Sequence, residues 1–181
     1  MSVSAFVVAL LGAESTGKTT LATGLGDALA VRGLRVEVVA EVLREFCDTH
    51  ARTPRRDEQA AIAAAQTARI GAAAARAEIV IADTTALMIA VYSDFVFGDR
   101  SLYADAVLAQ RRVDLAIVTA LDLPWRADGL QRDGAHVREP VDALLRTALA
   151  RTGVVTATVG GLGSDRLDAA LSVIDAALAA R

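Results

Sequence analysis

The chain alternates between short apolar runs and longer stretches with helical spacing. Five runs are rich in Val, Ile and Leu, and each is short enough to form one strand of a sheet. They cover residues 3–11, 35–40, 78–83, 113–121 and 154–159. Runs this apolar are typical of parallel strands, which are buried on both faces. The pattern therefore predicts five parallel strands.

Helical patterns lie between these strands. Leu21, Leu25 and Leu29 recur every four residues, which places them on one face of a helix. The alanine-rich residues 55–77 and the segment 84–97 predict two more helices. Two later helical faces consist of Val141, Leu144, Leu145 and Ala148, and of Leu167, Leu171, Ile174 and Leu178. This alternation predicts an α/β fold with three layers, a five-stranded parallel sheet covered by helices on both sides.

Length and composition narrow the class of protein. The 181 residues predict a single domain spanning 1–181. No apolar stretch approaches the roughly 18 residues of a membrane span, and the net charge of -3 gives no basic field for nucleic acid. Neither a membrane nor a nucleic acid is therefore an expected partner. Cys47 is the single cysteine, which favours a reducing, cytoplasmic location.

The first strand runs directly into a phosphate-binding loop motif, GxxxxGK[ST]. Its residues are Gly12, Ala13, Glu14, Ser15, Thr16, Gly17, Lys18 and Thr19, with Thr20 as a further predicted nucleotide contact. The motif lies between a strand and a helix, where backbone amides can surround a phosphate, and it predicts a P-loop NTPase fold. Lys18 would reach the β- and γ-phosphates, and Thr19 would bind Mg²⁺. The expected cofactors are ATP and Mg²⁺; GTP is disfavoured because Lys18 is the only lysine.

Acidic residues end two neighbouring strands. Asp83 is the expected second ligand of the metal, although it could instead cap the following helix, as Thr84 or Thr85 could. Glu41 is the expected base that orients the acceptor hydroxyl, although an ion pair with Arg44 is an alternative. The carboxyl ends of parallel strands meet at one edge, so these acids should lie near the loop.

The segment 123–138 is long, irregular and polar, and it predicts a mobile lid. Its arginines are Arg126, Arg132 and Arg138, and one of them could bind the transferring phosphoryl group. Arg132 is assigned this catalytic role. Trp125 could stack on the acceptor or pack the root of the lid against the domain.

Four segments together resemble the NadR-type nicotinamide riboside (ribosylnicotinamide) kinases. They are the loop with Glu14-Ser15, the stretch 41–46, the Asp83-Thr84-Thr85 strand end and the stretch 123–130 with its Pro-Trp and Asp-Gly pairs. A glutamine-bearing helix around Gln66 is similar as well. The resemblance implies an acceptor site formed by Glu41, Arg44, Gln66, Trp125 and Asp128.

The resemblance also implies the reaction. ATP would phosphorylate nicotinamide riboside at its ribose 5′-hydroxyl, giving ADP and nicotinamide mononucleotide for NAD salvage. Two alternatives stay open on the residues alone. One is a kinase of another nucleoside, nucleotide or coenzyme precursor, and the other is a regulatory ATP-binding module with slow hydrolysis. The pattern makes no prediction of oligomeric state.

Overall fold

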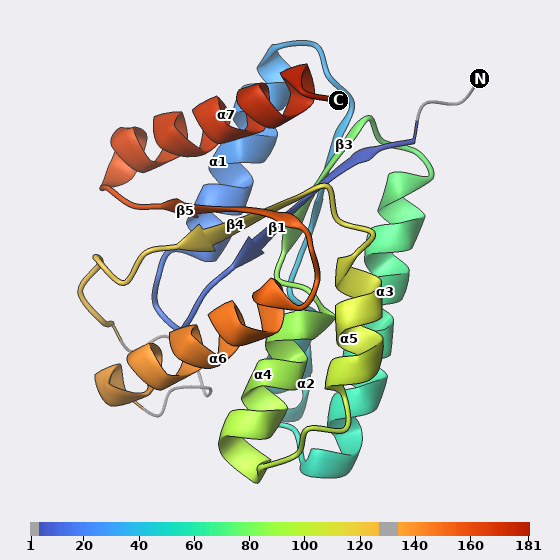
Figure 1. The fold of residues 1–181 in the computed structure, drawn as a ribbon, viewed down its shortest axis with the longest axis vertical. Coiled ribbons are helices and arrows are strands. Elements are labelled where there is room, and N and C mark those ends of the chain that lie inside the picture. Colours follow the sequence, from blue (N-terminus) through green and yellow to red (C-terminus); the bar gives the residue numbers. More distant parts are fainter. Residues whose placement is uncertain (1–3, 127–133) are drawn as a thin grey trace.

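A single parallel sheet forms the centre of the molecule (Figure 1). The computed structural model describes residues 4–126 and 134–181. The sheet has the strand order β2-β3-β1-β4-β5. Its strands are β1 (Phe6–Leu11), β2 (Val36–Val39), β3 (Ile79–Asp83), β4 (Leu115–Thr119) and β5 (Val155–Val159). All neighbouring strands pair in parallel, which confirms the predicted sheet.

Helices cover both faces of the sheet, as predicted. One face carries α1 (Lys18–Val31) and α7 (Gly163–Ala179), which lie side by side in Figure 1. The opposite face carries α2 (Val42–His50), α3 (Gln59–Ala74), α4 (Ala86–Phe97), α5 (Tyr103–Gln110) and α6 (Arg138–Ala150). None of the helices in the described ranges combines the length and the apolar character that crossing a bilayer requires.

The core is split by the sheet because successive side chains of a strand point to opposite faces. In β1, Val8 and Leu10 pack toward α1 and α7, whereas Val7, Ala9 and Leu11 pack toward the larger helical layer. All residues of β1 are buried. The central strand is therefore held on both sides, which fixes the position of the loop that follows it.

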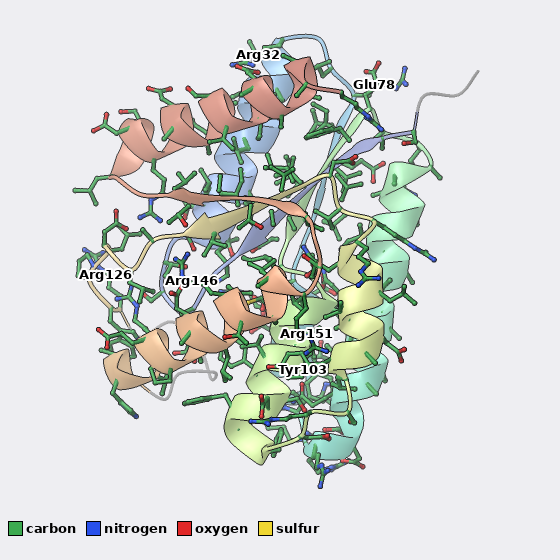
Figure 2. All side chains as sticks on the ribbon, in the orientation of Figure 1. Arg32, Glu78, Tyr103, Arg126, Arg146 and Arg151 are labelled. Carbon is green, nitrogen blue, oxygen red and sulfur yellow. The ribbon has the colours of Figure 1, made fainter. Side chains whose placement is uncertain are left out.

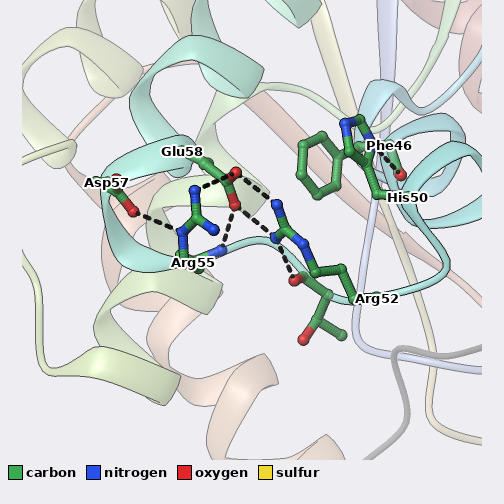
Figure 3. Close-up of polar contacts among 7 residues, drawn as sticks. Phe46, His50, Arg52, Arg55, Asp57 and Glu58 are labelled. Carbon is green, nitrogen blue, oxygen red and sulfur yellow. Dashed lines mark hydrogen bonds and ion pairs between the residues drawn. The ribbon is translucent and has the colours of Figure 1, made fainter.

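Residues 55–77 differ from the single helix that their composition predicts. The 3₁₀ turn η1 (Arg56–Glu58) precedes α3, because Glu58 folds back on the segment before it. Its carboxylate accepts a hydrogen bond from the backbone amide of Arg55 (2.8 Å) and two from the guanidinium of Arg52 (2.7 Å each), as Figure 3 shows. The Arg52 guanidinium and the Arg55 amide lower the pKa of Glu58 from 4.5 to about 2.

This ion pair should make stability depend on pH in the acidic range. A carboxyl whose folded pKa is depressed stabilises the fold above its unfolded pKa and loses that contribution as the pH falls through its folded pKa. We expect the melting temperature of wild-type protein to exceed that of Glu58→Gln at about pH 6, and the gap to shrink as the pH falls from about 4.5 toward 2. A gap that does not change with pH, measured by circular dichroism, would contradict the assigned role of the ion pair.

Candidate functional site

Three of the predicted site residues, Gly12, Glu41 and Asp83, lie at the carboxyl edge of the sheet. Strand β1 lies between β3 and β4, so the chain passes first to one side of β1 and then to the other. Ligands of such sheets bind in the crevice at this switch point. Gly12 follows β1, Asp83 ends β3 and Glu41 follows β2, so the topology brings all three to this edge.

The loop after β1 begins with a backbone approach that only glycine permits. Gly12 has a φ of 150°, and a Cβ atom there would lie 2.2 Å from the Thr119 hydroxyl at the end of β4. That hydroxyl lies 2.7 Å from the hydroxyl of Thr16, which donates to the carbonyl of Ala13 (2.9 Å). The loop is thus anchored on β4 through two buried threonines.

Two residues of the loop adopt left-handed backbone angles. Ser15 has a φ of 55° and Gly17 a φ of 78°. Alternation of left-handed and right-handed residues turns successive amides toward one concavity, which suits an anion. Gly17 is also the N-cap of α1 and supplies no side-chain cap, so the positive end of the helix faces the same concavity.

Lys18 lies over this loop. Its ammonium group donates a hydrogen bond to the carbonyl of Ala13 (2.8 Å). Burial lowers the pKa of Lys18 from its usual value, and the nearby carboxylates of Glu41 and Asp83 act in the opposite direction. A half-buried cation flanked by these acids can bind phosphate oxygens at the mouth of the crevice.

Thr19 and Asp83 meet directly. The Thr19 hydroxyl donates to Oδ2 of Asp83 over 2.6 Å, across 64 residues of sequence. Asp83 is 3% exposed, and its Oδ1 is buried without a hydrogen-bond partner among the described residues. A hydroxyl and an unsatisfied carboxylate oxygen suit Mg²⁺, which takes its remaining ligands from phosphates and water. Asp83 does not cap α4, because the Thr85 hydroxyl accepts from the Leu87 amide (3.3 Å).

Glu41 occupies the N-cap position of α2, after the carboxyl end of β2. The carboxylate is 15% exposed and lies 3.8 Å from Nε of Arg44, so the ion pair considered as an alternative is present. The charge of the Glu41 carboxylate acts to raise the pKa of Lys18, against the effect of burial. The arrangement is compatible with a base that Arg44 holds in place. The role of Glu41 as the base and the role of Arg44 in the acceptor site stay predictions.

Gln66 is fully buried, and its amide is occupied by backbone groups. It accepts a hydrogen bond from the amide of Val42 (2.8 Å) and donates to the carbonyls of Ala40 (3.4 Å) and Thr84 (3.2 Å). These bonds tie α3 to the ends of β2 and β3, next to Glu41 and Asp83. Its observed contacts position neighbouring site residues, whereas its contact with substrate stays a prediction.

The described start of the predicted lid, residues 123–126, contacts the phosphate loop. The Ser15 hydroxyl accepts from the backbone amide of Arg126 over 2.9 Å. Trp125 is half-buried, and its indole Nε1 is buried without a hydrogen-bond partner in the described part of the chain. Asp128 and Arg132 lie outside the described residues. Thr20 is exposed on the first turn of α1.

The sequence reasoning missed Arg166, which joins three loops of the site. Its guanidinium donates to the carbonyls of Thr16 (2.5 Å) and Gly161 (2.9 Å) and pairs with Asp122. The Gly161 amide and Arg166 lower the pKa of the Asp122 carboxyl. One signal could have revealed it: Arg166 stands in the first turn of α7, where a cation opposes the helix dipole and needs a specific partner.

Known proteins share this architecture. Residues 7–166 match a family model described as an AAA domain. The chain belongs to this AAA domain family. No curated protein sequence matches it significantly.

Three solved structures have the same fold. A NadR protein in complex with NAD and AMP-PNP has a TM-score of 0.73 at 20% identity, covering 94% of this chain and 48% of its own. A NadR protein in complex with NR has a TM-score of 0.68 at 22% identity, covering 94% and 50%. Thymidylate kinase from Ehrlichia chaffeensis has 0.66 at 13% identity, covering 96% and 99%. The chain therefore spans about half of the NadR proteins and has a P-loop kinase fold.

The contact between Gly12 and Thr119 gives a test of the loop. Gly12→Ala places a methyl group against the Thr119 hydroxyl, and we expect the affinity for AMP-PNP to fall at least about tenfold. The matched control is Gly71→Ala in α3, where a Cβ meets nothing within 4 Å; it should keep the wild-type affinity. Isothermal titration calorimetry gives the affinity of both variants for AMP-PNP. Wild-type affinity in Gly12→Ala would contradict the described role of this close approach.

Proposed function

We propose that this protein is an ATP-dependent phosphotransferase acting on a small nucleoside, with nicotinamide riboside as the acceptor. The observation that carries the proposal is the hydrogen bond between Thr19 and Asp83 beside Lys18. It brings a hydroxyl, a buried carboxylate and a cation together at the phosphate loop. P-loop enzymes that transfer phosphoryl groups use such a set to hold a nucleotide with its metal.

Each residue has a defined part in the transfer. The loop amides and the N-terminus of α1 bind the phosphates, and Lys18 binds oxygens of the β- and γ-phosphates. Thr19 and Asp83 would hold Mg²⁺, which neutralises charge on the transferring group when bound. Transfer is in line: the acceptor oxygen forms a bond to the γ-phosphorus while the bond between the γ-phosphorus and the β,γ-bridging oxygen breaks. ADP is the leaving group.

Glu41 is the group that receives the proton of the acceptor hydroxyl. Its carboxylate lies 3.8 Å from Nε of Arg44, and this ion pair supports a fixed position for the base. A carboxylate in this place orients the hydroxyl before transfer and takes up its proton late in the step. Gln66 supports this position because it binds the amide of Val42, the residue after Glu41.

Two observations support the choice of nicotinamide riboside. The segments around Glu41, Asp83 and Trp125 resemble those of NadR-type kinases, and the fold matches a NadR protein whose structure contains NR. The likeness to a thymidylate kinase favours a second candidate, a nucleotide acceptor, which the same assay can detect.

The proposal can be tested by product formation with purified protein, ATP and Mg²⁺. ADP release and the phosphorylated product are measured with nicotinamide riboside, with other nucleosides and nucleotides, and without acceptor. We expect release with nicotinamide riboside together with the mononucleotide. Lys18→Ala should lower kcat by about 10²–10³ because it removes a cation from the transition state.

The controls separate the alternatives. Arg32→Ala removes an exposed arginine that pairs with Asp175 far from the loop, and it should keep wild-type kcat. Transfer to a nucleotide, and not to a nucleoside, would show that the proposed acceptor is wrong and that the protein is still a kinase. ATP hydrolysis at a rate that no acceptor changes would show that the protein is an ATPase and not a kinase. Full activity in Lys18→Ala would contradict the proposed mechanism.

A further inference from the structure

A cavity lies between α4, α5 and α6, in the larger helical layer. Its volume is about 420 Å³, within the range of roughly 300–1,000 Å³ that is usual for sites of small organic ligands. Figure 2 labels Tyr103 and Arg151, which lie between α6 and the two helices α4 and α5. The wall includes Asp94, Arg100, Tyr103, Leu144, Thr147 and Arg151.

This cavity is separate from the crevice at the phosphate loop. Among the described residues that line it, none belongs to the loop 12–19, and neither Glu41 nor Asp83 contributes to its wall. Asp94 stands in the last turn of α4, about 12 Å along the helix from Ala86 at 1.5 Å per residue. A ligand in the cavity would therefore leave the crevice open to a nucleotide.

The acid of the cavity is already neutralised. The Asp94 carboxylate accepts hydrogen bonds from Nε of Arg100 (3.1 Å) and from the hydroxyl of Tyr103 (3.2 Å), one on each oxygen. Burial, and then the charge of Asp94, raise the pKa of Tyr103 to about 12, so the phenol keeps its proton and continues to donate. Because both carboxylate oxygens are engaged, the cavity is poorly suited to a cation.

Arg151 is the charged group that remains for a ligand. Its guanidinium lies over the Tyr103 ring, 5.7 Å from the centroid, in a cation–π contact. In the described parts of the chain, no carboxylate forms an ion pair with it. Arg151 is exposed and is the C-cap residue of α6, where the helix dipole favours a cation. Its donors are thus held beside the cavity and are accessible from solvent.

The rest of the wall is largely apolar. Leu144, Ala148 and the Tyr103 side chain come from facing helices, and Ala104 lies on the exposed side of α5. Apolar surface of a ligand gains free energy when such a wall removes it from water. An apolar wall with one or two polar groups that fix the orientation is the usual composition of a small-molecule site.

We infer that this cavity is a second ligand site, which binds a small organic anion with an apolar body, such as an aromatic carboxylate or sulfonate. Arg151 donates charge-assisted hydrogen bonds to the anionic group, and the wall around Leu144 packs against the apolar body. The inference does not rest on the proposed function, because neither the nucleotide nor the phosphate acceptor occupies this cavity.

Two dyes of similar shape test the inference. Anilinonaphthalene sulfonate is an aromatic anion that fluoresces in apolar surroundings, and phenylnaphthylamine is its uncharged analogue. Each dye is titrated into the folded protein with excess Mg²⁺ and AMP-PNP, and again without them. Arg151→Met removes the charge, and its control is Arg32→Met at the end of α1. Ala104→Phe fills the cavity, and its control is Ala150→Phe at an exposed position of α6.

The inference predicts a different response to each change. Arg151→Met should bind the sulfonate at least about fivefold more weakly than Arg32→Met, because a hydrogen bond to a charged group is lost. The two variants should bind the uncharged dye equally. Ala104→Phe should weaken the binding of both dyes by at least about fivefold relative to Ala150→Phe, because its ring occupies the cavity. AMP-PNP should leave the affinity for the sulfonate unchanged.

Three results would overturn the inference. One is a loss of affinity for the sulfonate below about fivefold in Arg151→Met, or an equal loss for the uncharged dye. Another is binding that Ala104→Phe leaves unchanged, which would place the dye elsewhere. The third is displacement of the sulfonate by AMP-PNP, which would place it in the nucleotide crevice. If circular dichroism shows that Arg151→Met does not fold, Ala104→Phe decides. Failure of AMP-PNP to bind would contradict only the proposed function.

Discussion

The close approach of Gly12 to Thr119 is the constraint on which the site depends. Because no side chain fits between the loop and the end of β4, the backbone turns sharply there. The buried hydroxyls of Thr119 and Thr16 then hold the loop against the strand. The groups that we expect to bind phosphate come directly after this turn: the left-handed residues Ser15 and Gly17, the N-terminus of α1, and Lys18 above the loop.

Charged side chains are concentrated at this edge of the sheet in a way that favours binding over stability. Among residues 4–126 and 134–181, the buried Asp83 has one oxygen without a hydrogen-bond partner, and the buried Arg138 has two such nitrogen atoms. Both arrangements cost free energy in the isolated protein, and a ligand of opposite charge would offset that cost at Asp83. Arg166 is the contrasting case: its guanidinium contacts Thr16, Gly161 and Asp122, and it joins the loops that carry them.

The strands and the phosphate loop could be predicted from the sequence for physical reasons. Parallel strands buried on both faces have continuous apolar runs, and the loop needs glycines and a lysine at fixed spacing. The short helices α2 and α5 were not predicted as elements, because eight or nine residues give too few turns for a clear period. The break before α3 was missed because it depends on Arg52 and Glu58 pairing in space.

Side-chain partners were harder to predict than elements. The predicted convergence of Thr19 and Asp83 rests on a motif whose geometry is local to two strand ends, and the structure brings these residues together. Arg166 lies 150 positions from Thr16, and no periodicity connects them. The same holds for Gln66, where a polar residue on an alanine-rich helix gives no sign that its amide binds the backbone of Ala40, Val42 and Thr84, which follow β2 and β3.

The central claim is that Thr19 and Asp83 form a site where nucleotide and Mg²⁺ bind together. The most direct measurement is the affinity for AMP-PNP with and without Mg²⁺ in Thr19→Val, with Thr67→Val in α3 as the control. The account predicts that the factor by which Mg²⁺ raises the affinity for AMP-PNP is at least about tenfold smaller in Thr19→Val than in the wild-type protein, and that it is unchanged in Thr67→Val. A gain from Mg²⁺ that is unchanged in Thr19→Val would contradict the account.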